Sequence, residues 1–150
     1  FILGLPIAFS PFGVGSILLA FLLLHFITGL SISLVFQTAH IMPEVSFPQA
    51  NENGIVEGER MLHQLATTSN YSENSPLFSW MIGGLNYQVE HHLFPDVCHV
   101  HYRNIAPIVK ATAAEYKIPY YTKKTFFDAL KAHAKMLYQL GRIEMQPVKV

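Results

Sequence analysis

The sequence predicts an all-α integral membrane protein with a helical cap outside the membrane, and two observations lead to this fold class. Charge is absent from residues 1–43, so all ten acidic and all ten basic side chains lie from Glu44 onward. Within the uncharged part, Ile17 to Ala39 is an apolar run that makes a helix of about 35 Å, enough to cross ~30 Å of hydrocarbon. We therefore expect a transmembrane segment in residues 1–43 and a cap in residues 44–150.

The transmembrane segment is expected to hold one complete span and the end of another. Phe1 to Phe9 is apolar but too short to cross the bilayer, so it reads as the end of a preceding span, followed by a turn at residues 10–13. The chain opens with neither an initiator methionine nor a charged signal region, and we expect a piece of a longer protein. His25 lies within the complete span, either as a neutral side chain bonded to a neighbouring helix or as a functional group. His40 follows this span directly, which suits it to a site at the membrane surface.

The cap is expected to consist of short helices joined by turns. Pro95 ends a helix that carries adjacent histidines, Thr122 is expected to cap the last helix, and Gly141 is expected to stop it. The predicted helices cover residues 59–68, 77–85, 87–94, 103–116 and 123–140, with a turn cluster over 70–76 and an extended stretch over 118–121.

Charge within the cap indicates which side of the membrane it occupies. Residues 97–150 contain nine basic and three acidic side chains, and basic segments beside a span favour the cytoplasmic side. The single cysteine, Cys98, excludes an internal disulfide and agrees with a reducing compartment. We therefore expect residues 44–150 on the cytoplasmic side.

Eight histidines occur in the chain, and their clustering indicates a metal site. On a helix over residues 87–94, Gln88, His91 and His92 share one face at spacings of three and four. An inverted zinc-protease motif, H-x-x-E-H, requires histidine at position 87, and Tyr87 excludes it. Three interpretations stay open: a structural zinc site with Cys98, His99 and His101, histidines without a ligand role, or a histidine-rich iron site that shares His40.

The stretch from Asn86 to Pro95 resembles the third histidine box, Q/H-x-x-H-H, of membrane fatty acid desaturases. Glutamine at position 88 in place of the first histidine resembles the front-end branch, which adds double bonds between an existing one and the carboxyl end. Further stretches resemble that branch: Phe36 to His40, Gln64 to Asn70 as Q-L-x-T-T-x-N, His101-Tyr102, and Ile105 to Val109.

This resemblance implies the chemistry and the site residues. It implies a non-haem diiron centre that uses O2, electrons from a cytochrome of the b type or a ferredoxin, and an acyl-CoA or acyl-lipid substrate in the bilayer. The implied metal ligands are His40, Gln88, His91 and His92, with His91 and His92 as the catalytic pair. Asn86 and Glu90 are expected to orient ligands, or Glu90 to be solvated; His99 and His101 are expected to be structural, and His63 and His133 to lie at the surface.

The family's first two boxes, H-x-x-x-H and H-x-x-H-H, occur nowhere in the chain. The four implied ligands are too few for two irons, so we expect the chain alone to be inactive. A lipid hydroxylase of the same superfamily remains the alternative within the enzyme class. A membrane receptor or scaffold with structural zinc is the non-enzymatic alternative.

Overall fold

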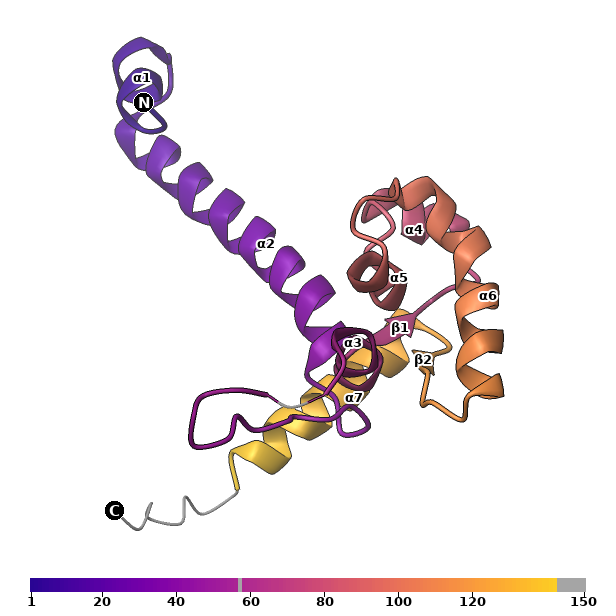
Figure 1. Cartoon of the computed structure of the whole chain (residues 1–150). Helices are drawn as coiled ribbons and strands as arrows, with labels where there is room; N and C mark the ends of the chain where they lie inside the picture. Colours follow the sequence, from indigo (N-terminus) through magenta and orange to yellow (C-terminus); the bar gives the residue numbers. More distant parts are fainter. Residues whose placement is uncertain (57, 143–150) are drawn as a thin grey trace. The chain divides into compact units, whose positions relative to one another are not determined.

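The computed structural model describes residues 1–56 and 58–142, which form helices and one pair of short strands (Figure 1). The α-helices are α1 (Gly4–Phe9), α2 (Val14–His40), α3 (Arg60–Thr67), α4 (Pro76–Met81), α5 (Gln88–Leu93), α6 (Tyr102–Glu115) and α7 (Phe126–Leu140). A 3-10 turn, η1 (His99–His101), and two strands, β1 (Ser69–Tyr71) and β2 (Tyr121–Lys123), complete them. Contacts divide the chain into two compact units, residues 1–34 and residues 35–150.

The first unit contains α1 and most of α2, which is the one helix in the described residues long and apolar enough to cross a membrane. Its 27 residues extend over roughly 40 Å. The helix begins at Val14, three residues before the predicted start, because the amides of Ser16 and Ile17 already bond the carbonyl of Gly13. Leu22 and Phe26 are 63% and 67% exposed, as expected of side chains that face lipid.

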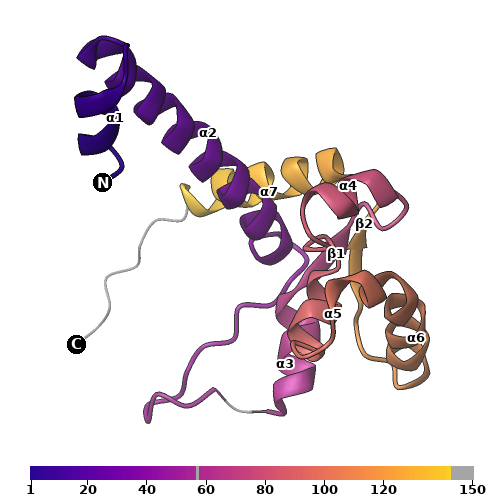
Figure 2. The ribbon, with the colours of Figure 1, turned by 90° about the horizontal axis from the view of Figure 1, so that it is seen from above.

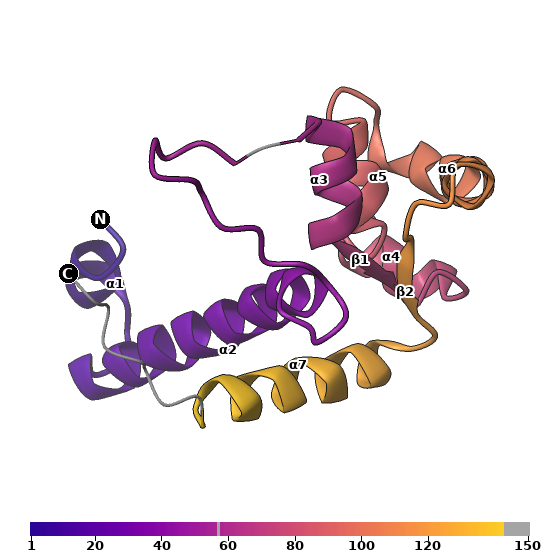
Figure 3. The same cartoon turned by 60° about the horizontal axis from the view of Figure 1, so that its bottom comes forward.

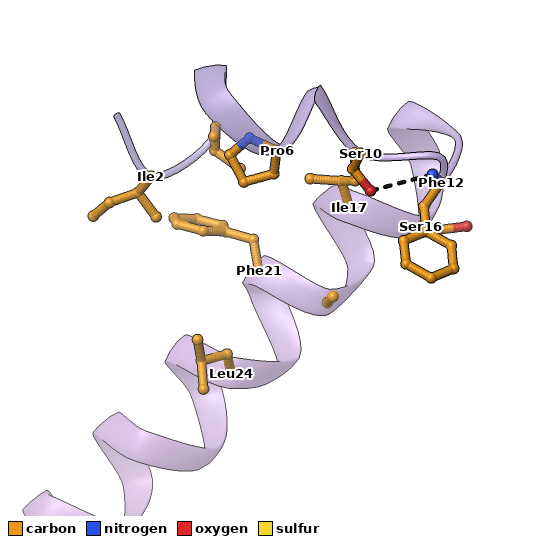
Figure 4. Close-up of a pocket in the computed structure, with 10 residues that line it drawn as sticks. Ile2, Pro6, Ser10, Phe12, Ser16, Ile17, Phe21 and Leu24 are labelled. Carbon is orange, nitrogen blue, oxygen red and sulfur yellow. Dashed lines mark hydrogen bonds between the residues drawn. The ribbon is translucent and has the colours of Figure 1, made fainter. Parts of the chain in front are cut away.

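An apolar pocket of about 480 Å³ lies between α1 and α2 within the first unit (Figure 4). The side chains of Ile2, Pro6 and Phe21 face it, and Ser10 accepts a hydrogen bond from the amide of Phe12 at its edge. None of the candidate metal ligands lines it. This pocket is therefore separate from the candidate chemistry.

The second unit places α5 in contact with α3, α6 and β1 (Figure 2). Beside them, β1 and β2 pair in parallel, with Ser69 opposite Tyr121 and Tyr71 opposite Lys123 (Figure 3). The helical class is confirmed, and the predicted turn is present but begins at residue 72 rather than 70, because β1 extends to Tyr71. The pairing of two strands was not part of the predicted all-α fold. Strands of three residues show no alternating pattern, and their partners lie about fifty positions apart, so only tertiary packing reveals them.

Aromatic packing joins the end of α2 to α7 within this unit. Tyr71 packs with Ala39 and Ala129, and the rings of Phe78 and Phe126 surround them.

The start of α7 differs from the prediction. Thr125, not Thr122, caps α7. Its hydroxyl accepts a hydrogen bond from the backbone amide of Asp128, and the Asp128 carboxylate accepts one from the backbone amide of Thr125. Thr122 instead belongs to β2, while Gly141 ends the helix as predicted.

Candidate metal centre

The helix α5 carries the histidine box, and its limits follow from the residues on both sides. Gly84 precedes it with φ +75°, a conformation that favours glycine, and a Cβ there would lie 3.1 Å from the Cβ of His99. Pro95 follows it, and the residue before a proline disfavours helical geometry, so α5 ends at Leu93. The N-cap residue, Tyr87, gives the first turn no side-chain hydrogen bond. Contacts from other parts of the chain must therefore stabilise this short helix.

Three nitrogen atoms converge from two segments that are far apart in the sequence. The Nε2 atoms of His40 and His92 lie 3.2 Å apart. The Nε2 atom of Gln88 lies 3.3 Å from the Nε2 of His92 and 3.5 Å from that of His40. The end of α2 and the first and fifth residues of α5 therefore form one cluster, and its members are three of the four predicted ligands.

The amide of Gln88 fits a role as a metal ligand. Its side chain is buried, and its Oε1 atom has no hydrogen-bond partner within the described part of the chain. The oxygen and nitrogen of an amide are assigned from their hydrogen bonds, and a rotation of 180° would direct Oε1 at both imidazoles. A buried oxygen without a donor is costly, whereas a cation between the imidazoles would satisfy it.

The protonation of the two imidazoles also suits metal binding. His40 Nδ1 lies 3.4 Å from the carbonyl oxygen of Thr67, which can only accept a hydrogen bond, so Nδ1 carries the proton and the free lone pair of His40 is on Nε2. Burial, followed by the charges of His40, His91 and Arg60, lowers the pKa of His92 to about 4. His92 is therefore neutral at physiological pH, which is the form that binds a metal.

His91 lies apart from the converging atoms. Its Nδ1 is 3.4 Å from the hydroxyl of Tyr102, a buried residue of α6, and its ring meets that of His92 edge-on at 5.6 Å between centroids. The structure thus brings His40, Gln88 and His92 together and pairs His91 with Tyr102.

The remaining histidines form no second cluster of this kind. His99 and His101 are exposed in η1, and Cys98 Sγ lies 4.0 Å from His99 Nδ1. Across residues 1–56 and 58–142, no three side chains of His, Cys, Asp or Glu are grouped closely enough to hold a metal ion. The converging set is thus two imidazoles and one amide, which are part of a coordination sphere and leave positions for other ligands.

Glu90 is buried, so the expectation that it is solvated was wrong. Its carboxylate accepts hydrogen bonds from Asn70 Nδ2 at 2.7 Å and from the hydroxyl of Tyr120 at 2.9 Å. Glu73 belongs to the same network and accepts from Asn70 at 3.1 Å and from Thr122 at 2.8 Å. Helix spacing explains the burial, because a residue two positions from Gln88 and His92 lies on the opposite face.

Electrostatics in this network differ from those of exposed carboxylates. Burial raises the pKa of Glu90, although the hydrogen bonds from Asn70 and Tyr120 act in the opposite direction. Burial and the charges of Glu90 and Glu73 raise the pKa of Tyr120, which keeps its hydroxyl a donor.

Three other predicted residues each place a side-chain nitrogen near a backbone carbonyl. His133 is buried rather than at the surface, and its Nδ1 lies 3.0 Å from the carbonyl of Ile41, because α7 packs against this part of the chain. Asn86 is buried, and its Nδ2 lies 3.4 Å from the carbonyl of Ser72. His25 directs Nδ1 to the carbonyl of Phe21 in its own helix, 2.8 Å away.

Sequence reasoning missed the residues that support the box from behind, namely Asn70, Glu73 and Tyr120. Asn70 lies at the end of the Q-L-x-T-T-x-N stretch, and this position could have indicated a role at the histidine box. The stretch N-Y-S is also typical of a turn and of a glycosylation sequon, and these interpretations were preferred. The side chain of Asn70 is fully buried.

Comparison with known proteins identifies the family of the chain. The family model for fatty acid desaturases matches residues 1–124. The chain is 41% identical over 95% of its length to an acyl-lipid (8-3)-desaturase of Physcomitrium patens, of which it covers 29%. It is 39% identical over 91% of its length to an acyl-lipid (8-3)-desaturase of Mortierella alpina, of which it covers 30%.

A third relative, an sn-1 linoleoyl-lipid 6-desaturase of Synechocystis sp., is 32% identical over 95% of the chain, which covers 40% of it. The chain therefore spans well under half the length of these relatives. No solved structure matches it significantly. The resemblance seen in the histidine box is confirmed, and the chain belongs to the fatty acid desaturase family.

Proposed function

We propose that this chain provides part of the diiron site of a membrane-bound, front-end acyl desaturase. The single observation that carries the proposal is the approach of His40 Nε2 to His92 Nε2, 3.2 Å apart across 52 residues of sequence. The buried amide oxygen of Gln88, which has no hydrogen-bond partner among the described residues, supports it, because metal ligation satisfies such an atom. Membership of the desaturase family supplies the reaction class.

Within the proposed site, His40, Gln88, His91 and His92 hold iron, and His91 and His92 form the catalytic pair. Iron and dioxygen supply the oxidising power that removes hydrogens from unactivated methylene carbons, which acids and bases of the protein cannot do. The neutral imidazoles of His40 and His92 present lone pairs, and Gln88 presents its amide oxygen or orders a water. His91 would bind through Nε2, because its Nδ1 already contacts the hydroxyl of Tyr102.

The substrate class follows from the relatives and from the box. The three relatives described above are named for acyl-lipid or linoleoyl-lipid substrates, so we propose a lipid-linked acyl chain as the substrate. Glutamine at position 88 favours the front-end type, in which the new cis double bond lies on the carboxyl side of an existing one. Electrons come from a cytochrome of the b type or a ferredoxin, delivered to residues 44–150 on the cytoplasmic side. The chain alone is inactive, because it contributes too few ligands for two irons.

The test is metal content and product analysis of the complete reading frame that contains this chain. We expect His92→Ala and His40→Ala to lose at least half of the bound iron and to lower desaturation by more than about 100-fold, since metal ligands act as a unit. His101→Ala is the matched control, because His101 is exposed, and it retains iron and product within twofold.

Three outcomes would contradict the proposal in whole or in part. Unchanged iron content in His92→Ala means that the site lies elsewhere. A wild-type protein that holds zinc and converts no lipid supports the scaffold alternative. A hydroxylated product in place of a double bond keeps the site but replaces the desaturase with a hydroxylase.

A further inference from the structure

Asn70 holds the helix of the histidine box with both ends of its amide. Its Oδ1 accepts the backbone amide of Val89, 2.9 Å away, and its Nδ2 donates to the carboxylate of Glu90 at 2.7 Å. Val89 and Glu90 are the second and third residues of α5, whose own N-cap residue supplies no side-chain bond. Asn70 therefore does from β1 what an N-cap residue does from within a helix.

These two contacts require an amide at position 70. A backbone N–H needs an acceptor and a carboxylate needs a donor, and asparagine offers one of each, side by side. The pairing with Val89 also fixes the orientation of the amide, so that Nδ2 must face Glu90. Aspartate would present a carboxylate to both Glu90 and Glu73, which now accept from Asn70 at 2.7 and 3.1 Å, and like charges repel strongly in a buried site.

The segment that contains Asn70 also contacts the other ligand-bearing element, the end of α2. Thr67 directs its carbonyl to His40 Nδ1 at 3.4 Å, and the Tyr71 hydroxyl donates to the carbonyl of Val35 at 2.8 Å. Tyr71 also packs against Ala39, next to His40 in the sequence. Residues 67–71 thus touch both His40 and the helix of His92 within four positions of chain.

A second strand restrains this segment. Asn70 pairs with Thr122 across the parallel bridge between β1 and β2 (Figure 3). The Tyr120 hydroxyl, just before β2, bonds Glu90 at 2.9 Å and lies 2.7 Å from Asn70 Nδ2. Asn70 is therefore bonded both to α5 and to the residues at β2.

We propose that Asn70 is a positioning residue, which holds His92 and Gln88 against His40 through its paired bonds to Val89 and Glu90. It does not bind metal itself. The inference rests on the proposed metal site, and its test must separate failure of Asn70 from failure of that site.

The test reverses donor and acceptor in the full-length protein. Asn70→Asp removes the donor, and we expect about tenfold weaker binding of Co²⁺ to the iron-stripped protein, followed by visible absorption. Adding Glu90→Gln restores a donor opposite the carboxylate introduced at position 70 and should return Co²⁺ affinity to within threefold of wild type. Asn104→Asp, the same substitution at an exposed position of α6, leaves affinity unchanged.

Each result has one meaning. Wild-type Co²⁺ affinity in Asn70→Asp overturns the inference, and so does a double variant that binds no better than Asn70→Asp. Thermal unfolding of the metal-free proteins is the structural control. Positioning is supported if the double variant regains Co²⁺ affinity but its metal-free melting temperature remains equal to that of Asn70→Asp. Co²⁺ binding that survives His92→Ala shows instead that the proposed site itself is wrong.

Discussion

The helices α5 and α7 both have a carboxylate at their third residue, but the two carboxylates receive their hydrogen bonds from different places. In α7, Asp128 exchanges hydrogen bonds with Thr125, three residues earlier, in a capping box. In α5, Glu90 bonds Asn70 and Tyr120, which are 20 and 30 residues away. The start of α7 is thus specified locally, whereas α5 depends on the tertiary fold.

The pKa values of the two carboxylates diverge for the same reason. The hydrogen bond from Thr125 lowers the pKa of Asp128, which is exposed. Burial raises the pKa of Glu90 despite two good donors. A buried carboxylate is costly unless it is fully bonded. We infer that the stability of α5, which carries the histidines, depends more on distant residues than that of α7 does.

The largest expected effect comes from removing the carboxylate of α5. Glu90→Ala removes the nearer carboxylate from the buried donors of Asn70 and Tyr120, whose remaining carboxylate contacts are the longer ones to Glu73, at 3.1 and 3.3 Å. We expect a loss of about 3 kcal/mol in the free energy of unfolding. Chemical denaturation of the detergent-solubilised, full-length protein measures this loss. Asp128→Ala is the matched control in α7 and should cost clearly less; equal losses would remove the contrast between the helices.

A second prediction concerns the first residue of α5. Gln88→Leu keeps much of the volume but removes the polar atoms beside His40 and His92, so we expect metal affinity to fall by about 10- to 100-fold. Gln88→His supplies an imidazole and should retain affinity within about tenfold of wild type. Competition with a chelator of known affinity gives both values. Equal binding by the leucine variant and wild type would show that Gln88 is not part of the site.

A smaller effect is expected at Tyr120. Tyr120→Phe removes one hydroxyl that donates to Glu90 and lies 3.3 Å from Glu73, and a hydrogen bond to a charged group contributes about 1.5–3 kcal/mol. Because Asn70 remains, we expect a loss near the lower end, about 1.5 kcal/mol. Hydrogen exchange should show faster opening of α5 and no change in α7. Equal acceleration in both helices would contradict the local role of this hydroxyl.

The smallest effect is expected from the cap of α7. Thr125→Ala removes the side-chain acceptor of the Asp128 amide and should cost about 1 kcal/mol, as for other N-caps. Thr125→Ser keeps the hydroxyl and should be nearly neutral. Metal content should stay at the wild-type level in both variants. A lower iron content in Thr125→Ala would show that the metal site depends on α7, and it would contradict the contrast between the two helices.

Much of the fold was predictable, because its signals are local. The uncharged run up to Ala39 marks α2, Pro95 marks the end of α5, and Gly141 marks the end of α7. The parallel pairing of residues 69–71 with 121–123 carried no such signal. The division into residues 1–43 and 44–150 describes membrane topology and stays a prediction.

The candidate site was predictable in part. The spacing of Gln88 and His92 places them on one face of α5, and the position of His40 after the span made it a candidate ligand. The burial of Glu90 and of His133 was not predictable, because it depends on which elements pack behind each helix. His91 also has the spacing of a ligand, and only the structure pairs it with Tyr102.

The sequence by itself determined the long apolar helix, the helix of the histidine box and the family. These follow from composition and from spacings of a few residues, which fix local geometry whatever the rest of the chain does. Only the tertiary structure decided that His40 reaches His92, that Gln88 is left with an unpartnered oxygen, and that Asn70 supports them. Those contacts join segments 20 to 52 residues apart, and a hydrogen bond between such segments exists only after packing has brought them together.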